Sequence, residues 1–223
     1  MAKQLSEFLP EVVPQVPGCP VMVAKNAVRN AAITFCERTK AYRKELTAIN
    51  LVASTKDYAY TAFTLPTDTL VWRPIRVAII DGSDETKLEK VTPEDLDSDA
   101  QYANWRTETG TPFGYYAKDQ NSTLRVIWTP DTSITGGLFM EAALKPSKAA
   151  AEVEDGFFNA YFDDIAAGAL AALLSMAAEP WTNATKAADY LARFNRAIAD
   201  HTVKIAEGEV DAPLRTVSYY SIG

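Results

Sequence analysis

Two segments far apart in the sequence show the pattern of helices that pack against a partner. The first predicts a helix over residues 21 to 45, because apolar residues recur every three or four positions while most charged side chains fall on the other side. The positions on its apolar stripe are Val28, Ala31, Ala32, Phe35, Cys36, Thr39 and Tyr42. The second segment, residues 165 to 178, is apolar nearly all round and predicts a buried helix. We therefore expect the two ends of the chain to pack together.

The pattern changes to alternation between residues 46 and 145, which predicts an antiparallel β region. A long strand is expected over residues 71 to 80, and Asp81-Gly82 behind it is a strong hairpin signal. Thr92 is placed to cap a short helix over residues 93 to 98. Further strand segments are expected at 46 to 52, 58 to 63, 86 to 91, 114 to 118, 123 to 128 and 137 to 144.

The ends of the chain carry different signals. A short helical segment is expected around Leu5 to Leu9, and prolines at positions 10, 14, 17 and 20 predict that residues 1 to 20 form a stiff, extended arm ahead of the helix. Helices are expected over residues 156 to 207, with Asn183 as the cap of the second and Gly208 as its end. Residues 209 to 223 lack helical periodicity and alternate weakly, which predicts an extended tail.

Length and composition fit one domain over residues 1 to 223. A chain of 223 residues can bury one substantial core, and 48% hydrophobic and 23% charged residues are ordinary for a globular protein. The predicted fold class is α+β. Its helical layer comes from the N- and C-terminal thirds, with an antiparallel β region inserted between them and an extended C-terminal tail.

Charge and residue counts exclude several classes of function. The net charge of −7 argues against a protein that grips nucleic acid by its phosphates, since that takes a surplus of Lys and Arg. Two cysteines and one histidine cannot build the usual four-ligand zinc site, so we expect no metal and no cofactor. The N-terminus lacks a secretory signal, and the apolar run at 165 to 178 is shorter than the roughly 20 residues of a membrane span. The protein is therefore expected to stay in the cytoplasm of the cell that makes it.

Candidate catalytic residues all have plainer interpretations. His201 lies on an apolar helical stripe without a nucleophile or carboxylate spaced for a triad, which favours a core or interface histidine. Cys36 lies on the apolar face of its helix, as a buried, inert thiol would. Asp163 and Asp164 are adjacent on a helix and do not face each other, so solvated charges or an ion pair are favoured. No catalytic residue and no enzyme activity are predicted.

The C-terminal tail is the candidate binding segment. It is more hydrophobic than disordered ends usually are, and such segments often add to the edge of a partner's sheet or lie in its groove. A frayed terminus is the other interpretation. The residues expected to contact a partner are Leu214, Arg215, Val217, Tyr219 and Tyr220.

Five short motifs occur together in this chain. They are Pro-Gly-Cys-Pro at 17 to 20, Phe-Cys-Glu-Arg-Thr at 35 to 39, Leu-Lys-Pro-Ser at 144 to 147, Gly-Ala-Leu-Ala at 168 to 171 and Glu-Pro-Trp at 179 to 181. In this order and rough spacing the chain, from about Phe8 to about Arg215, resembles the head-to-tail adaptor family of tailed bacteriophages, also called connector or head-completion proteins.

The resemblance implies a structural protein of the virion. In that family, subunits form a ring, commonly a dodecamer, under the portal of the filled capsid, and the ring extends the DNA channel and offers a platform to the tail. The implied partners are the portal protein, other copies of the chain and the next tail protein, with genomic DNA passing through without specific binding. The implied location is the head–tail junction, after assembly in the host cytoplasm. Whether the C-terminal tail binds the portal or a neighbouring subunit stays open.

The aromatic residues of the β region suggest an alternative. They could form a stacking platform in a carbohydrate- or receptor-binding virion module. The residues concerned are Trp72, Trp105, Tyr115, Tyr116 and Trp128. Leu124, Val126 and Trp128 are expected on one strand face, as in an ordinary sheet core, which favours core or interface roles.

Overall fold

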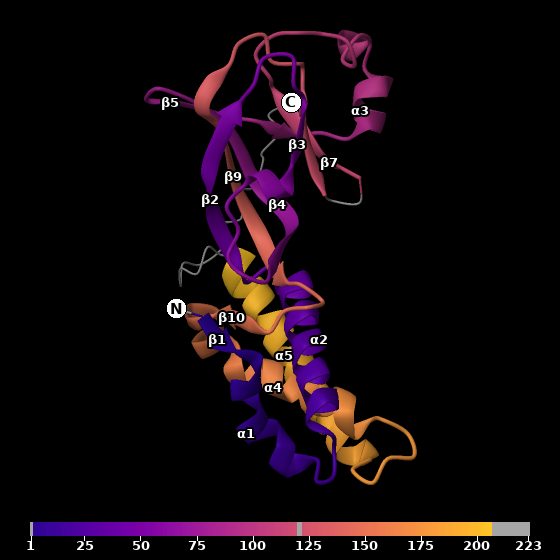
Figure 1. Cartoon of the computed structure of the whole chain (residues 1–223). Helices are drawn as coiled ribbons and strands as arrows, with labels where there is room; N and C mark the ends of the chain where they lie inside the picture. Colours follow the sequence, from indigo (N-terminus) through magenta and orange to yellow (C-terminus); the bar gives the residue numbers. More distant parts are fainter. Residues whose placement is uncertain (1, 120–121, 207–223) are drawn as a thin grey trace.

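The fold is described here from a computed structural model, which covers residues 2–119 and 122–206. The long helices gather in one half of the molecule, while the two four-stranded sheets and the short helix α3 (Pro93–Ser98) lie in the other, with a short two-stranded ribbon between the halves (Figure 1). This arrangement confirms the predicted α+β class: a helical layer from both ends of the chain and an inserted, mainly antiparallel β region.

Three helices form the core of the helical layer: α2 (Val21–Thr39), α4 (Asp155–Leu174) and α5 (Ala184–Ala206). The stripe predicted on α2 is buried against α4 and α5, which confirms that the two ends of the chain pack together. Phe35 lies at the centre, with its ring centroid 5.0 Å from that of Tyr161 on α4 and 6.3 Å from that of Phe194 on α5. Helix α5 begins after Asn183, whose side chain accepts a hydrogen bond from the backbone N–H of Lys186 at 3.0 Å, as predicted.

The N-terminal arm is not extended as predicted, although the short helical segment expected around Leu5 to Leu9 is present. It forms three short helical turns, η1 (Leu5–Phe8), α1 (Leu9–Val12) and η2 (Val13–Gln15). Pro10 and Pro14 lie in the first turn of α1 and η2, where a helix does not need the missing N–H. The residues Leu5, Phe8, Val12 and Val16 are buried at helical spacing. Burial of this stripe outweighs the extended preference of the prolines.

Helix α2 ends at Thr39, six residues before the predicted end at 45. Lys40 adopts a left-handed backbone conformation with φ of 57°, which stops the helix. The hydroxyl of Thr39 donates to the carbonyl of Phe35 at 2.7 Å and accepts from the N–H of Ala41 at 3.1 Å. These bonds satisfy backbone groups at the helix end and turn the chain into the first strand.

The first sheet has four antiparallel strands in the order β2-β9-β4-β5. Its strands are β2 (Arg43–Leu51), β9 (Ile134–Pro146), β4 (Thr69–Asp81) and β5 (Asp84–Lys87). The hairpin predicted at Asp81-Gly82 joins β4 to β5, and Gly82 has a φ of 62°, which suits glycine. Strand β5 is shorter than the strand predicted over residues 86 to 91 and ends at Lys87.

The second sheet has the order β3-β8-β7-β6. Its strands are β3 (Asp57–Ala59), β8 (Thr123–Ile127), β7 (Gly114–Lys118) and β6 (Glu89–Lys90). The β6–β7 pair is parallel, while the other pairs are antiparallel as predicted. Helix α3 (Pro93–Ser98) covers one face, and the Thr92 side chain accepts from the N–H of Asp95, which confirms the predicted cap. Two further 3₁₀ turns are η3 (Tyr60–Ala62) and η4 (Ala100–Tyr102).

Strand β8 separates two cores. Leu124 and Val126 point into the main core, whereas Ile127 belongs to a second cluster with Leu96 and Trp105. Trp128 was predicted on the face of Leu124 and Val126, but it packs against the second cluster. The reason is its backbone, since a φ of 27° at Trp128 breaks the alternation just after β8 ends.

The main apolar core continues through both halves of the molecule, and a ribbon and two groups of polar contacts also join them. The ribbon pairs β1 (Ala2–Gln4) with β10 (Glu152–Glu154) in antiparallel fashion. In the first contact group, Glu154 accepts from the Tyr42 hydroxyl at 2.9 Å and from Lys44 Nζ at 2.9 Å. In the second, Lys145 on β9 pairs with Glu37 on α2 at 2.6 Å. The Trp72 indole donates to the Glu37 carbonyl at 3.2 Å.

Candidate interaction surfaces

A groove of about 740 Å³ lies between α2, α4 and α5. Its walls consist mainly of small apolar residues, namely Ala27, Ala31, Gly168, Ala171, Ala172, Ala184, Ala187 and Ala188. Asn26, Asn30 and Thr34 add polar groups from α2. Leu191 lines the groove and is 50% exposed, and the nearby residue Met22 on α2 is 64% exposed. Exposed apolar surface of this kind is typical of protein interaction sites.

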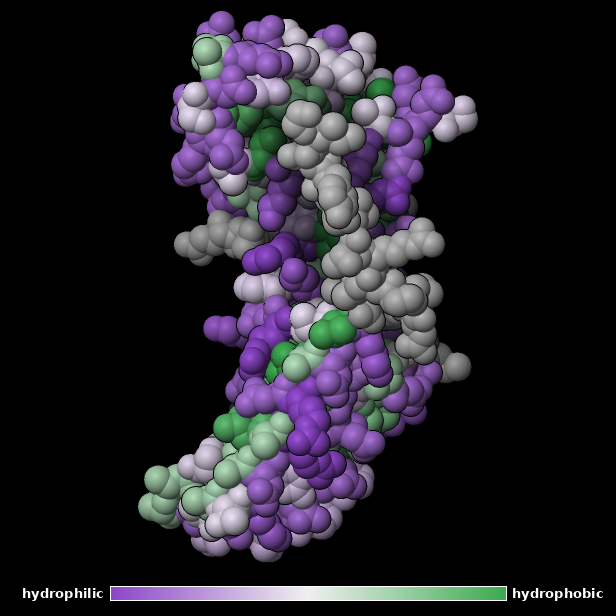
Figure 2. Space-filling view, turned by 180° about the vertical axis from the view of Figure 1, so that it is seen from behind, coloured by the Kyte–Doolittle hydropathy of each residue, from purple (hydrophilic) through white to green (hydrophobic). Residues whose placement is uncertain are grey.

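The groove follows from the spacing of small residues on the three helices. On α2 and α5 the lining residues recur every three or four positions, so each helix turns one continuous face to it. Alanine and glycine keep the side chains short, so the helices do not fill the space between these faces. Figure 2 shows apolar surface between polar surfaces over the helical half, seen from the side opposite to Figure 1. The sequence prediction of a wholly buried apolar helix missed this, because Ala172 of α4 is exposed.

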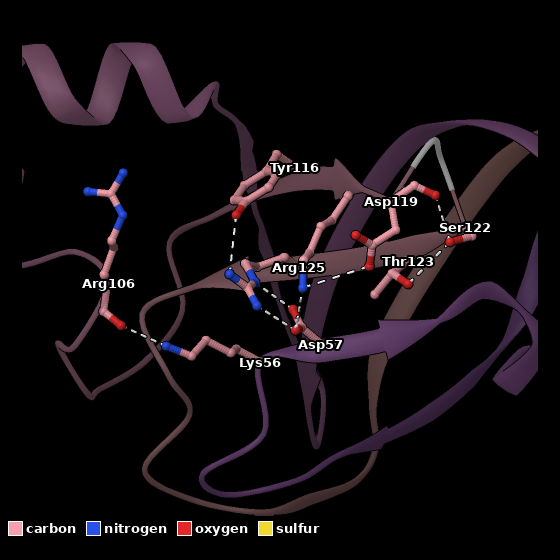
Figure 3. A network of polar contacts seen from close by, with 9 residues as sticks. Lys56, Asp57, Arg106, Tyr116, Asp119, Ser122, Thr123 and Arg125 are labelled. Atoms are coloured by element: carbon pink, nitrogen blue, oxygen red, sulfur yellow. Dashed lines mark hydrogen bonds and ion pairs between the residues drawn. The ribbon is translucent and has the colours of Figure 1, made fainter.

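Charged side chains also form a polar network on the second sheet (Figure 3). Arg125 of β8 binds the Asp57 carboxylate of β3 through two hydrogen bonds of 2.5 Å, and it also donates to the Tyr116 hydroxyl at 3.4 Å. Lys118 approaches the same carboxylate to 3.2 Å. The network joins three neighbouring strands, and every charge in it is paired, so its arrangement is that of a structural clamp.

The hydrogen bonds from Arg125 hold the pKa of Asp57 below its usual value, helped by Lys118 and opposed by partial burial. A lowered folded-state pKa adds stability that is complete above the unfolded value of about 3.9 and is lost as the pH falls through the folded value. Asp57→Asn should therefore lower the free energy of unfolding by about 1 kcal/mol at pH 7, since solvent screens this half-exposed pair. Urea titrations should show that this deficit shrinks below about pH 4. Asp119→Asn, at a 58% exposed side chain that approaches Lys118 only to 3.7 Å, is the control and should cost little at any pH.

The aromatic residues proposed as a ligand platform are divided between the two cores. Tyr115 is 3% exposed in the main core, and Trp105 is 6% exposed in the second cluster. Tyr116 and Trp128 pack against that second cluster. Trp72 lies instead near the joint of the two halves, under the Lys145 ammonium group, which is 4.2 Å from its ring centroid. These side chains do not share one exposed surface.

Acrylamide quenching of tryptophan fluorescence checks this arrangement. The chain has four tryptophans; Trp105 and Trp181 are buried, and Trp72 and Trp128 are half-buried. We expect the native protein to be quenched several-fold less than the same protein in denaturant. Quenching close to the denatured value would instead support an exposed aromatic platform.

The candidate catalytic residues His201, Asp164 and Cys36 lie among packing contacts of the helical layer. His201 Nε2 lies 2.9 Å from Asp164 Oδ2, and its ring makes edge contacts with Phe35 and Tyr161. Asp164 thus shares a hydrogen bond with His201. Cys36 is fully buried, and this burial raises the pKa of its thiol far above its ordinary value. Within residues 2–119 and 122–206, no three His, Cys, Asp or Glu side chains gather where they could hold a metal ion.

One helix in the described part of the chain, α4, is long and apolar enough to span a membrane by length and composition. Its residues Ile165, Leu170 and Leu174 are buried in the main core against the other helices. This burial supports the predicted role as a core helix. The predicted contact residues Leu214, Arg215, Val217, Tyr219 and Tyr220 lie outside the described residues.

Comparison with protein families decides the class of this molecule. A family model described as SU10 adaptor protein matches residues 6–217, which is nearly the whole chain. The chain belongs to the SU10 adaptor protein family. This is a bacteriophage head-to-tail adaptor family, so the resemblance found in the sequence motifs is confirmed. No curated protein matches the chain. Membership in the SU10 adaptor family identifies the chain as a structural component of a phage.

Proposed function

We propose that this SU10 adaptor protein forms a ring that joins the portal of the phage capsid to the tail and extends the DNA channel. The observation that carries the proposal is the family match over residues 6–217. The partners are the portal protein, other copies of the chain in a ring, a dodecamer as is common in such adaptors, and a downstream tail protein. The protein acts in the virion at the head–tail junction after assembly in the host cytoplasm, and it has no enzymatic role.

Charge and surface character support this proposal. A net charge of −7 suits a surface past which DNA slides, because an acidic wall repels the phosphates instead of binding them. The exposed apolar groove between α2, α4 and α5 is the kind of surface that proteins with protein partners carry. The fully buried Cys36 is not accessible as a nucleophile.

The experiment that tests the proposal is the removal of residues 209 to 223, the segment expected to contact the portal. The truncated protein should keep its circular dichroism spectrum, since the main core and the second cluster both lie within residues 2–206. Its co-sedimentation with portal particles should fall at least tenfold, because tyrosine and arginine anchors often contribute 2 kcal/mol or more each to an interface.

The full-length variant Arg215→Ala/Tyr219→Ala/Tyr220→Ala is the matched control, because it keeps the length of the chain and removes only three side chains. It should lose portal binding to a similar extent. Unchanged binding by both proteins would move the portal contact to another surface, and absence of binding by the wild type would contradict the adaptor role.

A further inference from the structure

The outer edge of β2 is open over the second half of the strand. Strand β2 pairs with β9 on one side, and none of the described strands pairs with its other side. The strand begins with the charged residues Arg43, Lys44 and Glu45, but from Leu46 to Leu51 it carries no charge and no proline. Folded proteins usually block such edges with charges, prolines or bulges, because unpaired N–H and C=O groups attract another strand.

Most other strand edges in the described part of the chain are protected or short. The part of β4 that β5 does not cover contains Pro74 and two register shifts. Strands β3 and β6 are only three and two residues long. Strand β5 is fully exposed and its outer edge is open, although it carries Asp84, Glu85 and Lys87. The register shifts beside Ile49 bend β2, and the charges of β2 lie before them, at residues 43 to 45.

The two edges of the first sheet are complementary in direction and in level. Each neighbouring pair in the order β2-β9-β4-β5 is antiparallel, so β2 and β5 run in opposite directions. They also lie at the same level, because Ile49 and Ile79 are both partners of Leu138, and Ile79 is the partner of Thr86. A copy rotated about a ring axis would therefore bring its β2 beside β5 in antiparallel orientation.

We propose that β5 of one copy pairs with β2 of the next, so that the first sheet continues from subunit to subunit around the ring. This inference rests on the proposed ring. A ring needs two different, complementary surfaces on each subunit, and the opposite edges of one sheet meet that requirement. The hairpin that carries β5 projects sideways from the sheet in Figure 1, where it is free to reach a neighbour.

Charge also favours this pairing over an isologous one. Asp84 and Glu85 would meet the uncharged end of β2, so the pairing brings no like charges face to face between copies that each carry −7. Two β2 strands could pair with each other around a two-fold axis, but this would give a closed dimer instead of a ring.

Thiol cross-linking tests the proposal. The test uses the double variant Thr47→Cys/Lys87→Cys. Thr47 and Lys87 are both exposed, and the native Cys19 and Cys36 are buried. Within one chain the two positions are separated by three strand spacings, about 14 Å, so a bis-maleimide shorter than about 10 Å does not link them. On portal particles the double variant should give a ladder of dimers, trimers and higher multimers. Each single variant should remain monomeric on a denaturing gel.

Images of the same portal particles by electron microscopy separate the possible failures. Rings without the ladder would overturn the β2–β5 pairing and leave the adaptor function standing. Dimers from Thr47→Cys alone would overturn it in favour of β2–β2 pairing. Absence of both rings and ladder would overturn the pairing and the proposed function together.

A matched charge pair provides a second readout. Val52 follows β2 and is 43% exposed, so a charged side chain there leaves the core intact. Val52→Glu, facing the acidic hairpin of the neighbour, should lower the yield of rings several-fold relative to Val52→Lys, and added salt should reduce the difference. Equal yields from the two variants would contradict the pairing.

Discussion

Replacement of Phe35 by alanine should lower the free energy of unfolding by about 4 kcal/mol, the largest effect expected for a single substitution here. Phe35 is 0% exposed and holds together all three helices of the helical layer. Its ring contacts Tyr161 of α4, and it contacts Phe194 and His201 of α5. Loss of this ring removes apolar contacts from both partner helices and leaves a cavity that rigid helices fill only in part. A loss of this size is a large share of the 5–15 kcal/mol that typically stabilises a domain.

Urea denaturation followed by circular dichroism measures the change. Phe139→Ala is the control, because Phe139 is half-buried on β9 and its ring contacts the Arg76 guanidinium at 5.4 Å. It should cost much less than the Phe35 substitution. Similar losses for the two variants would mean that Phe35 does not lie at the centre of the helical layer.

Leucine at Gly168 should be the second most damaging change, with a loss of about 3 kcal/mol. A Cβ atom at this position would come within 2.8 Å of Cε2 of Phe194, and three ring atoms lie at 3.0 Å or less. Overpacking of this kind forces side chains off their preferred rotamers or moves the backbone, which typically costs 1–3 kcal/mol. A glycine inside a helix of alanines and leucines suggests close approach of another backbone, but at Gly168 the structure shows an aromatic ring instead.

Gly156→Leu is a matched control in the same helix. A Cβ atom at Gly156 would meet nothing within 4 Å, so leucine should be tolerated there or should slightly stabilise α4. A second comparison is the double variant Gly168→Ala/Phe194→Leu, in which leucine replaces the aromatic ring that would clash with the added methyl group. If Gly168→Leu melts at the wild-type temperature, the packing of α4 on α5 differs from that described here.

Local signals in the sequence predicted much of the fold. The cap at Thr92 and the hairpin at Gly82 depend on residues within a few positions, so their outcome did not rest on distant contacts. The stripe on α2 was also predicted, because an apolar face implies a partner. The N-terminal arm was not, since the burial of Phe8 between Phe158 and Phe162 depends on residues 150 positions away.

The interaction surfaces were harder to predict. The groove needs three helices in a particular arrangement, and a run of alanines does not reveal which of them face solvent. The complementary edges β2 and β5 depend on strand order, which alternation along the chain does not determine. The predicted contacts at 214 to 220 stay predictions, because they rest on sequence character alone.

The joint between the two halves has a mechanical consequence. Within the described residues the chain passes between the helical half and the sheet half twice, from α2 to β2 and back from β9 to β10. The two crossings lie beside the contacts made by Glu154 and Glu37. Tension along the long axis would load both crossings in parallel and pass through ion pairs that solvent reaches. Because salt screens such pairs far more than it weakens apolar packing, ionic strength would change the contribution of these ion pairs, while the main apolar core, which continues through both halves, keeps the halves together.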